Sequence, residues 1–416
     1  MSDTLRTLFS GSRPSNGGDR ASSGDDTQAV SKEIRPDVTP GATIRVFGIG
    51  GGGSNAIKRM VESKVQGVEF VSVNTDIQAL YHNPAPTKIT VGRGTTRGLG
   101  AGANPDVGKK AAEESTEELK AALEGSDMVF LTAGLGGGTG TGGIGVIADL
   151  ARSMGILTVA VVTRPFSFEG AKRKRQADDA LEGLHDKVDT LVTIPNDKIL
   201  SLIDKTTPLT EAFEVVDEVL QHAIEGISNI ITVHGLVNVD FADVKTIMQD
   251  AGTALMGIGY GTGDSRSAEA ARAAIDSPLL ELSIDGAKGI LFNITGGNDL
   301  SMFEVDEAAR IITEAADPEA NIIFGAVIDE NFTGEVKCTV IATGFEPQEL
   351  ASRASFSMPA KRPLAEALSS SQRSYSQSQQ PGETIDSSAS HIDEEELEVP
   401  AFMRKKVSGV KMGTDE

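Results

Sequence analysis

The chain has 416 residues, 39% of them hydrophobic, and a formal net charge of −22 from 38 basic and 60 acidic residues. This apolar content suffices for a globular core, and the length predicts two or three domains. The strong negative charge repels phosphate backbones, so we expect no nucleic-acid partner. The single cysteine, Cys338, excludes an intramolecular disulfide framework and favours a reducing compartment.

The N-terminal segment, residues 1–42, is rich in Ser, Gly and Asp and lacks hydrophobic periodicity. This composition predicts a disordered arm, and it matches neither a secretory signal nor an organellar transit peptide. No stretch of the chain approaches the roughly 18 consecutive apolar residues of a membrane-spanning helix. We therefore expect a cytoplasmic protein without a direct membrane span.

Residues 43–207 alternate short apolar runs with helical patterns, which predicts βαβ units and a doubly wound, mainly parallel sheet. The predicted helices include residues 108–123 and 143–155. The predicted strands are TIRVFGI, VEFVSVN, DMVFLTA, ILTVAVVT and VDTLVTIP.

A long helix is predicted over residues 208–233, because apolar residues recur there at three- and four-residue spacing. We expect Thr207 as its N-cap and Pro208 at its first position. At 1.5 Å per residue the helix would be roughly 36 Å long, which suits a spine between two domains. Residues 234–345 then read strand, helix, strand, strand, typical of a smaller α/β domain with a mixed sheet.

The C-terminal part changes composition again. Residues 346–392 form a Ser/Gln-rich stretch, which predicts a disordered linker. Within residues 393–416, three glutamates precede an apolar cluster and then three basic residues. Such a cluster after a linker predicts a peptide that orders on contact with a partner, although an inert tail is the alternative. The residues expected to carry this binding are Val399, Pro400, Phe402, Met403 and Arg404.

Three glycine-rich loops stand out, and the first follows the first predicted strand. Gly48, Gly50 and Gly53 satisfy G-x-G-x-x-G, and Asp76 lies about 20 residues further on. By themselves these residues fit a dinucleotide-binding fingerprint, so an NAD-linked enzyme is one interpretation.

The second loop, GLGAGANPDVGKK, is a near miss to a phosphate-binding P-loop. Five residues separate Gly102 from Gly108-Lys109 where four are required, and Lys110 stands where a magnesium-binding Ser or Thr should be. We therefore expect Gly108 and Lys109 to lie in the first turn of a helix.

The third loop, AGLGGGTGTGG, spans Ala133–Gly143 and joins a strand to a helix. Glycine lets successive backbone N–H groups converge on an anion, and the helix N-terminus adds partial positive charge. Thr139 and Thr141 can add hydroxyl donors. Three such loops at the carboxyl ends of one parallel sheet predict a site for a polyphosphate.

The order of these motifs makes the prediction specific. GGGTGTG, Gly136–Gly142, resembles the signature of the tubulin/FtsZ superfamily of GTPases, and the chain from about Thr43 to Phe345 resembles the FtsZ family of bacterial cell-division proteins. Supporting matches are GIGGGGSNAI, VNTD, RGLGAGANP, RPFSFEG, IPNDKIL, GLVNVDFADV and NIIFGAVID. The resemblance implies a Mg²⁺-assisted GTPase that forms head-to-tail protofilaments and the cytokinetic ring at midcell.

The resemblance also implies the residues of the nucleotide site. Arg173 would contact phosphate and Glu169 ribose, although the two could be an ordinary i, i+4 surface pair. Phe213 would stack on guanine and Asp217 would accept its N–H groups, although Phe213 could simply pack in the core. The full implied GTP-binding set is Gly51, Gly52, Gly53, Ser54, Asn55, Gly138, Thr139, Gly140, Glu169, Arg173, Asn196, Phe213 and Asp217.

Catalysis is assigned by the resemblance to NVDFADV, with Asn238, Asp240 and Asp243 as catalytic residues. The plain alternative is that Asp240 caps the helix that follows. Because this segment comes after the long helix, we expect it at the opposite end from the glycine loops. The aspartates of one subunit would then polarise water at the γ-phosphate bound to the next subunit, which makes a non-closing, filament-forming contact.

The resemblance extends to partners and metal. The C-terminal peptide is similar to the one by which FtsZ proteins dock on membrane tethers, regulators and other division proteins. Magnesium would be held mainly by phosphates and water, so no protein ligand is expected. A non-hydrolysing adaptor that uses only this peptide is a further alternative.

Overall fold

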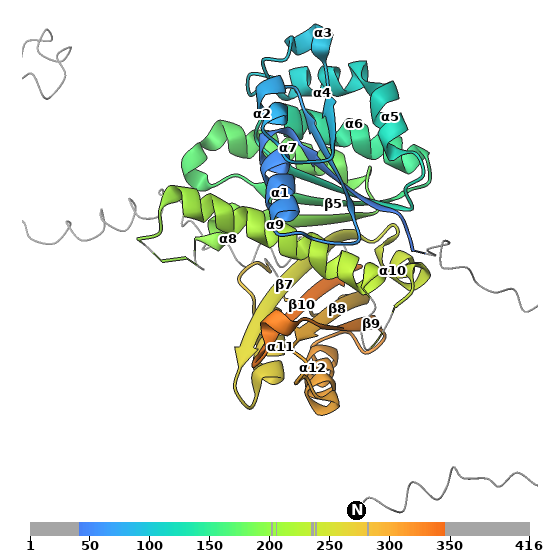
Figure 1. Cartoon of the computed structure of the whole chain (residues 1–416), viewed down its shortest axis with the longest axis vertical. Helices are drawn as coiled ribbons and strands as arrows, with labels where there is room; N and C mark the ends of the chain where they lie inside the picture. Colours follow the sequence, from blue (N-terminus) through green and yellow to red (C-terminus); the bar gives the residue numbers. More distant parts are fainter. Residues whose placement is uncertain are drawn as a thin grey trace, which may run out of the picture. The chain divides into compact units, whose positions relative to one another are not determined.

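The computed structural model describes residues 41–200, 203–204, 206–233, 237, 239–280 and 283–345. The linker 346–392 and the peptide 393–416 lie outside the described residues, as does the arm apart from its last two positions. Within the described part, ten strands form one sheet in the order β3-β2-β1-β4-β5-β6-β7-β10-β8-β9 (Figure 1).

The first six strands are all parallel and have the order 3-2-1-4-5-6. This confirms the doubly wound, mainly parallel sheet. In this order the topology reverses between β1 and β4, where open α/β sheets bind ligands. The strands are β1 (Ile44–Ile49), β2 (Glu69–Asn74), β3 (Thr87–Thr90), β4 (Met128–Gly134), β5 (Leu157–Arg164) and β6 (Thr190–Pro195).

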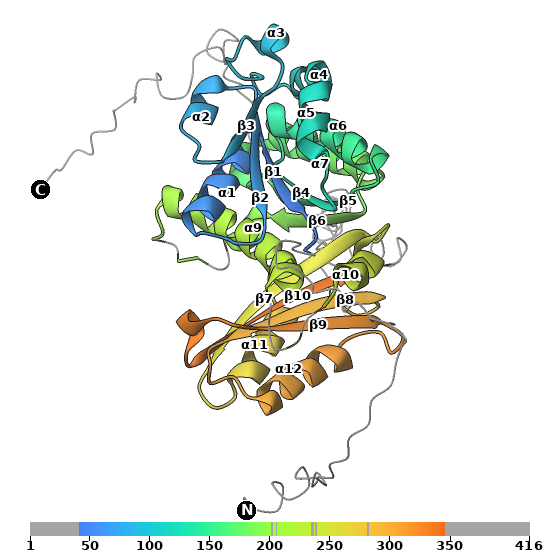
Figure 2. The ribbon, with the colours of Figure 1, turned by 45° about the vertical axis from the view of Figure 1, so that its right-hand side comes forward.

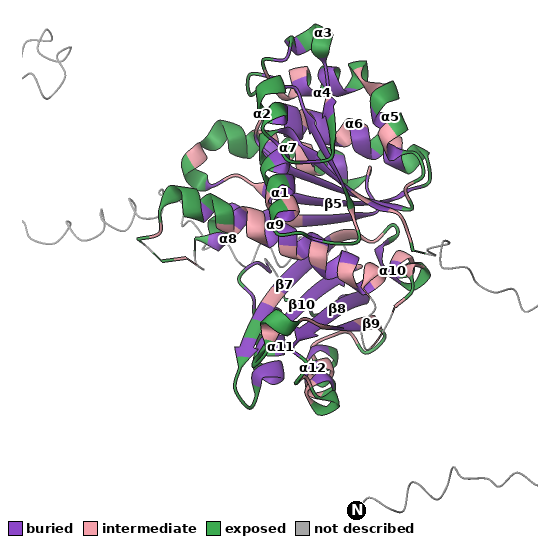
Figure 3. Ribbon diagram, viewed as in Figure 1, coloured by how far each residue is buried: buried purple, intermediate pink, exposed green. Residues whose placement is uncertain are grey.

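Helices cover both faces of these strands, so the strands are buried on both sides (Figure 3). Val46 and Phe47 are neighbours in β1 and both fully buried, yet they belong to different apolar clusters. This two-sided burial explains why the strands read as continuous apolar runs. The connecting helices are α1 (Gly50–Glu62), α2 (Ile77–Tyr81), α3 (Arg93–Thr96), α4 (Pro105–Glu114), α5 (Thr116–Leu123), α6 (Thr139–Ser153), η1 (Ser167–Glu169), α7 (Ala171–His185) and α8 (Asn196–Ile199).

The helix predicted over residues 108–123 is two helices, α4 and α5, which meet at Ser115. Ser115 leaves helical geometry and its hydroxyl accepts a hydrogen bond from the Gly92 N–H at 3.1 Å. A serine hydroxyl that bonds outside the helix competes with helix continuation, which accounts for the break.

The long helix is α9, Leu209–Thr232, and it matches the prediction to within one residue at each end. The predicted cap is wrong: Pro208 is the N-cap residue, Leu209 begins the helix, and no side chain caps it. α9 contacts α1 and β5 on one side and β8, β9 and β10 on the other, so it lies between the two halves of the sheet (Figure 2).

The C-terminal part is a smaller α/β unit with a mixed sheet, as predicted. β7 pairs parallel with β6 and antiparallel with β10, β10 pairs antiparallel with β8, and β8 pairs parallel with β9. The elements are α10 (Phe241–Met248), β7 (Gly252–Thr262), α11 (Arg266–Ile275), β8 (Gly289–Gly296), α12 (Met302–Glu314), β9 (Asn321–Ile328), η2 (Glu330–Phe332) and β10 (Glu335–Thr343).

β7 and α11 were not predicted, and for β7 the reason is glycine. Gly257, Gly259 and Gly261 alternate along β7 and face the backbone of α11. A Cβ at Gly259 would lie 2.0 Å from the Ala270 carbonyl oxygen, so the helix rests directly on the strand. A face made of glycine removes the apolar alternation that identifies a strand.

Candidate functional site

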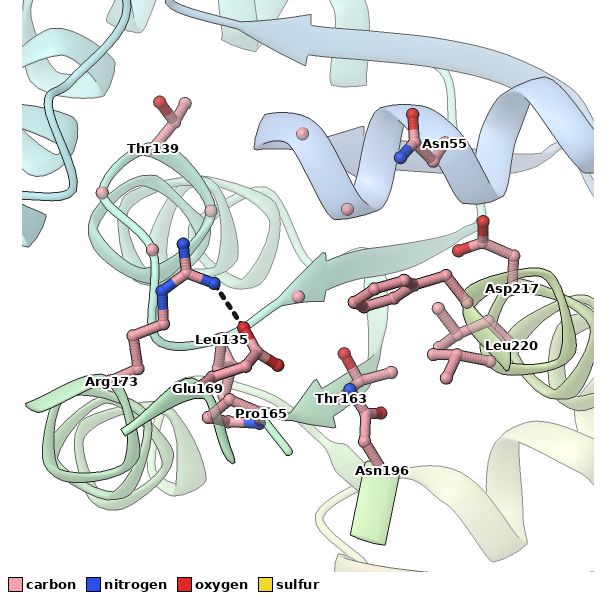
Figure 4. A pocket seen from close by; sticks show the side chains of 18 residues that line it. Asn55, Leu135, Thr139, Thr163, Pro165, Glu169, Arg173, Asn196, Asp217 and Leu220 are labelled. Carbon is pink, nitrogen blue, oxygen red and sulfur yellow. Dashed lines mark hydrogen bonds and ion pairs between the residues drawn. The ribbon is translucent and has the colours of Figure 1, made fainter. Parts of the chain in front are cut away.

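A pocket of about 460 Å³ opens at the carboxyl ends of β1, β4, β5 and β6, beside the first turns of α9 (Figure 4). It therefore lies at the β1/β4 switch point. Its walls come from the first and third glycine loops, from η1 and α7, and from α9. The lining residues are Gly51, Gly52, Asn55, Gly134, Leu135, Gly137, Gly138, Thr139, Gly140, Thr163, Pro165, Glu169, Arg173, Asn196, Phe213, Val216, Asp217 and Leu220.

One side of the pocket is backbone. α1 and α6 both begin there, neither has a side-chain cap, and neither carries an acidic residue in its first turn. Their first N–H groups are available to an anion, and both helix dipoles present positive charge. A Cβ built at Gly51 or Gly137 would meet no protein atom within 4 Å, so glycine here leaves open space for a ligand. These features fit a polyphosphate.

The two threonines of the third loop bond within the protein. The Thr141 hydroxyl accepts from the Gly136 N–H at 2.9 Å, and the Thr139 and Thr75 hydroxyl oxygens are 2.6 Å apart. Both side chains are buried, although Thr139 also lines the pocket, so donation from these hydroxyls to a ligand stays a prediction. Their hydroxyls hold the loop in shape.

The charged pair predicted at the pocket is present. Arg173 donates to the Glu169 carboxylate (Figure 4). The same carboxyl group accepts from the Phe166 N–H at 2.9 Å. Both residues line the pocket. They therefore form an i, i+4 ion pair and also belong to the site, so the two interpretations are compatible. The Arg173 side chain is half exposed and retains donors for a ligand.

The opposite side of the pocket has acceptors and a ring. The Asn196 Oδ1 atom is buried and has no hydrogen-bond partner among the described residues. Burial raises the pKa of the Asp217 carboxyl to about 6, although the positive charge of Arg59 opposes this shift. Phe213 packs edge-on against Phe166, with ring centroids 5.5 Å apart, and still lines the pocket. Two acceptors beside an aromatic face suit a planar base that carries N–H donors.

Two predicted residues do not line the pocket. Gly53 faces β4, where an added Cβ would lie 2.4 Å from the Thr132 carbonyl oxygen. Ser54 is buried and its hydroxyl bonds to that of Ser72 at 3.0 Å. Gly134, Leu135 and Gly137 also line the pocket; they belong to the third glycine loop, which was predicted to bind the polyphosphate, but were not in the implied GTP-binding set. Sequence analysis missed four lining residues, and only their position at strand ends or on the α9 stripe could have indicated them. They are Thr163, Pro165, Val216 and Leu220.

The dinucleotide interpretation fails at Asp76. Its Oδ1 atom accepts from the N–H groups of Gln78 and Ala79 at 2.8 and 3.2 Å, so it caps α2 and does not line the pocket. Gly48 also has a packing role, because a Cβ there would lie 2.3 Å from the Gly53 carbonyl oxygen. The fingerprint therefore reflects close strand–helix packing without the acidic residue that would bind a ribose.

The aspartates of the predicted catalytic segment lie elsewhere. Asp240 caps α10 by accepting from the Asp243 N–H at 2.9 Å, which confirms the capping interpretation. Both aspartates are exposed and neither lines the pocket. Their helix, α10, follows the C-terminal end of α9, whereas the pocket adjoins the first turns of α9 (Figure 1). The aspartates and the pocket therefore lie at opposite ends of α9. Asn238 lies outside the described residues.

Two further findings concern the described residues alone. They contain no cluster of three or more His, Cys, Asp or Glu side chains able to hold a metal ion. None of their helices combines the length and the apolar character that crossing a membrane requires.

Two protein families match the chain. The tubulin/FtsZ family, GTPase domain, matches residues 43–204, and the FtsZ family, C-terminal domain, matches residues 252–346. The first match contains both glycine loops that line the pocket, together with Glu169, Arg173 and Asn196.

Solved structures give the same result. An empty FtsZ dimer from M. jannaschii is 48% identical, covers 73% of this chain and 88% of its own, and superposes with a TM-score of 0.71. A mutant of that protein has the same identity and TM-score. A GTPγS-bound protofilament of CetZ2 from Haloferax volcanii is 20% identical, covers 79% of this chain and 99% of its own, with a TM-score of 0.63, and shares the fold.

Proposed function

The chain belongs to the FtsZ family of tubulin-like GTPases, and from this premise we propose that it assembles head to tail into protofilaments whose neighbouring subunits complete each other's active sites. GTP binding and hydrolysis follow from the GTPase domain. The observation that carries the proposal is the separation of Asp240 and Asp243 from the pocket. A pocket on one subunit that meets the aspartates of the next subunit is a heterologous, head-to-tail contact. Such a contact repeats without closing and yields a filament.

In the proposed site, the N-termini of α1 and α6 and the Arg173 guanidinium hold the polyphosphate. Asn196 and Asp217 accept hydrogen bonds from guanine, and Phe213 lies against its ring. The Asn196 acceptor would then gain the partner that it lacks among the described residues. Guanine fits because its N1–H and amino group both donate.

Mg²⁺ belongs to the proposal as well. Two carboxylates line the pocket: Glu169 is already bonded to Arg173 and the Phe166 N–H, and Asp217 lies on the side proposed for the base. Neither is free to bind a metal beside the phosphates, so we expect phosphate oxygens and water to coordinate the ion. When bound, Mg²⁺ would neutralise charge on the phosphates.

Hydrolysis needs a water molecule in line with the γ-phosphate. In the proposed filament, the exposed carboxylates of Asp240 and Asp243 approach that position from the adjacent subunit. They accept a hydrogen bond from the water and orient it as its oxygen attacks phosphorus and GDP leaves. One oxygen of Asp240 is used to cap α10, which fixes the side chain at the start of that helix.

The cellular role is also proposed. We infer that the filament forms the cytokinetic (Z) ring of a bacterial cell at midcell, in the cytoplasm. The C-terminal peptide with Val399, Pro400, Phe402, Met403 and Arg404 would recruit membrane tethers, regulators and other division proteins. That peptide lies outside the described residues, so this part of the proposal depends on its sequence.

Turnover should depend on protein concentration. If each site needs two subunits, GTP hydrolysis per subunit should be negligible at high dilution and rise above a threshold concentration, where filaments sediment. A phosphate-release assay and a sedimentation assay on the same dilution series measure both. A hydrolysis rate per subunit that stays constant on dilution to monomer would exclude the shared site, and unchanged GTP binding across the series is the control.

GTP binding should weaken in mild acid. The ionised Asp217 carboxylate is the form that accepts guanine N–H groups, and its pKa is about 6. Affinity should therefore be constant above pH 7 and fall by about tenfold between pH 7 and pH 5 as the carboxyl is protonated. Calorimetric titration of GTP across this range measures the effect. Asp217→Asn should bind weakly at every pH; an equal acid effect in that variant would assign the titration to another group.

A further inference from the structure

Two buried threonines bond to each other at the carboxyl edge of the sheet. The Thr75 and Thr139 Oγ1 atoms are 2.6 Å apart; Thr75 is fully buried and Thr139 is 9% exposed. Thr75 follows β2, and Thr139 is the first residue of α6, which follows β4. Because β1 lies between β2 and β4 in the sheet, the bond joins two strand ends that are not neighbours.

The bond lies next to the place where α1 and α6 begin. Gly50 has a φ of 71°, and a Cβ there would lie 2.7 Å from the Gly140 nitrogen and 3.3 Å from the Thr139 Cβ. The start of α6 therefore rests against Gly50 and is bonded by its Thr139 side chain to Thr75. The first turn of α6 has no side-chain cap, and it also packs closely on the start of α4, so the Thr75–Thr139 bond is the side-chain hydrogen bond that ties its first residue to the end of β2.

Thr75 also holds the loop before α4. Its carbonyl oxygen accepts from the Gly100 N–H at 3.3 Å and from the Thr96 hydroxyl at 3.4 Å, and its own N–H donates to Asn74 Oδ1. Every polar group of Thr75 is thus engaged within the protein. The side chain does not line the pocket and is not required to contact ligand.

We propose that Thr75 is a positioning residue of the GTP site, acting through Thr139 to hold the first N–H groups of α6 in the geometry that grips the polyphosphate. Figure 4 shows the Thr139 hydroxyl pointing away from the Glu169–Arg173 pair, which leaves the backbone to face the pocket. Anion binding by backbone N–H groups depends on their being fixed before the ligand arrives. The inference rests on the proposed function, because it assumes that α6 binds the phosphates.

The test is the isosteric variant Thr75→Val, which removes the hydroxyl and keeps the volume. It should weaken binding of GTP and of GDP by about tenfold, the usual effect of one lost buried hydrogen bond. KM should rise while kcat at saturating GTP stays unchanged, since the catalytic aspartates are untouched. Thr75→Ser, which retains the hydroxyl, should restore affinity to within about twofold.

Two further variants make the test specific. Thr139→Val should weaken binding as Thr75→Val does, and the double variant should be no weaker than either one, because both remove the same bond. Thr132→Val is the matched control: Thr132 is a fully buried threonine of β4 whose hydroxyl lacks a partner among the described residues. It should bind nucleotide like the wild type.

The outcomes separate the inference from the proposed function. Gly137→Val adds a side chain to the open space where the polyphosphate is proposed, and it should abolish binding. Normal GTP binding by Gly137→Val would overturn the site itself. Loss of binding by Gly137→Val together with normal binding by Thr75→Val, or with additive losses in the threonine double variant, would overturn the positioning role alone.

Discussion

Asp243→Ala is expected to bind GTP with wild-type affinity and to lose turnover by about 100-fold or more, the usual contribution of a group that activates the attacking water. The carboxylate of Asp243 is exposed and makes no hydrogen bond among the described residues, so its removal should leave folding unchanged. Equilibrium nucleotide binding, thermal unfolding and phosphate release on the same preparation measure the three quantities. Parallel loss of binding and turnover would indicate a folding defect instead.

The neighbouring aspartate needs a different substitution. Asp240→Ala would also remove the cap of α10, at a cost of about 1 kcal/mol. Asp240→Asn keeps a capping oxygen while removing the charge, so it isolates the catalytic contribution. Glu118→Ala, which removes an exposed carboxylate of α5, is the charge control and should hydrolyse GTP normally.

Mixing variants tests whether the two halves of the site come from different molecules. Asp243→Ala supplies a pocket without the catalytic carboxylate, and Gly137→Val supplies the carboxylate without a usable pocket. Each alone should be inactive, and the mixture should regain turnover where the second variant's aspartates meet GTP bound to the first. A mixture as inactive as its components, under conditions where both co-sediment, would place the catalytic groups in one chain.

The second large effect concerns stability. Arg266, the first residue of α11, is 6% exposed and donates to Asp299 at 2.6 Å and to Glu304 at 2.6 and 3.2 Å. Arg266→Met should leave two carboxylates beside an apolar side chain and lower the free energy of unfolding by about 2–3 kcal/mol. We place the loss in this range because Asp299 is partly exposed and solvent screens its charge. Urea denaturation measures the change.

The control is another arginine on the neighbouring helix. Arg310 and Glu314 of α12 form an exposed i, i+4 pair at 3.9 Å, and Arg310→Met should change the free energy of unfolding by less than about 0.5 kcal/mol. A loss at Arg310 equal to that at Arg266 would show that burial is not the cause.

The Arg266 effect should also depend on pH. Hydrogen bonds from Arg266 hold the pKa values of the Glu304 and Asp299 carboxyls below their usual range. Carboxyls with lowered pKa values stabilise the fold above their ordinary pKa, and the contribution is lost as the pH falls through the lowered values. The stability difference between the wild type and Arg266→Met should therefore be constant at neutral pH and should narrow as the pH falls below the ordinary carboxyl range of about 4.

The sequence predicts most of the fold because its signals are local. Apolar runs identify the parallel strands, and the stripe of α9 identifies that helix to within one residue at each end. β7 is not predicted because glycine occupies the face that packs on α11, so the strand lacks the alternating apolar side chains on which the prediction depends. The break at Ser115 depends on a hydrogen bond to Gly92, which lies 23 residues earlier in the chain.

The site is less accessible to sequence reasoning. The glycine loops indicate an anion from their composition, but Asn196, Phe213 and Asp217 come from a different strand end and from α9. Only the resemblance linked them to the glycines. Gly53 and Ser54 were predicted to bind GTP but do not line the pocket. The reason is that each residue of a helix is rotated by about 100° from the one before it, so adjacent residues face different ways. Gly51, Gly52 and Asn55 reach the pocket from α1, whereas the two residues between them face the core.

The distance between the pocket and the aspartates has a consequence for a whole filament. In a proposed chain of n subunits there are n pockets but only n − 1 junctions, so one terminal subunit always carries GTP that no neighbour can cleave. That terminal pocket is also the one left open to solution, free to exchange its nucleotide, while every internal pocket is covered. The two tips of such a filament are therefore chemically different from the moment it forms. The rates at which subunits add and leave at each tip would depend on the nucleotide bound there, so the two ends of the filament would grow and shrink differently.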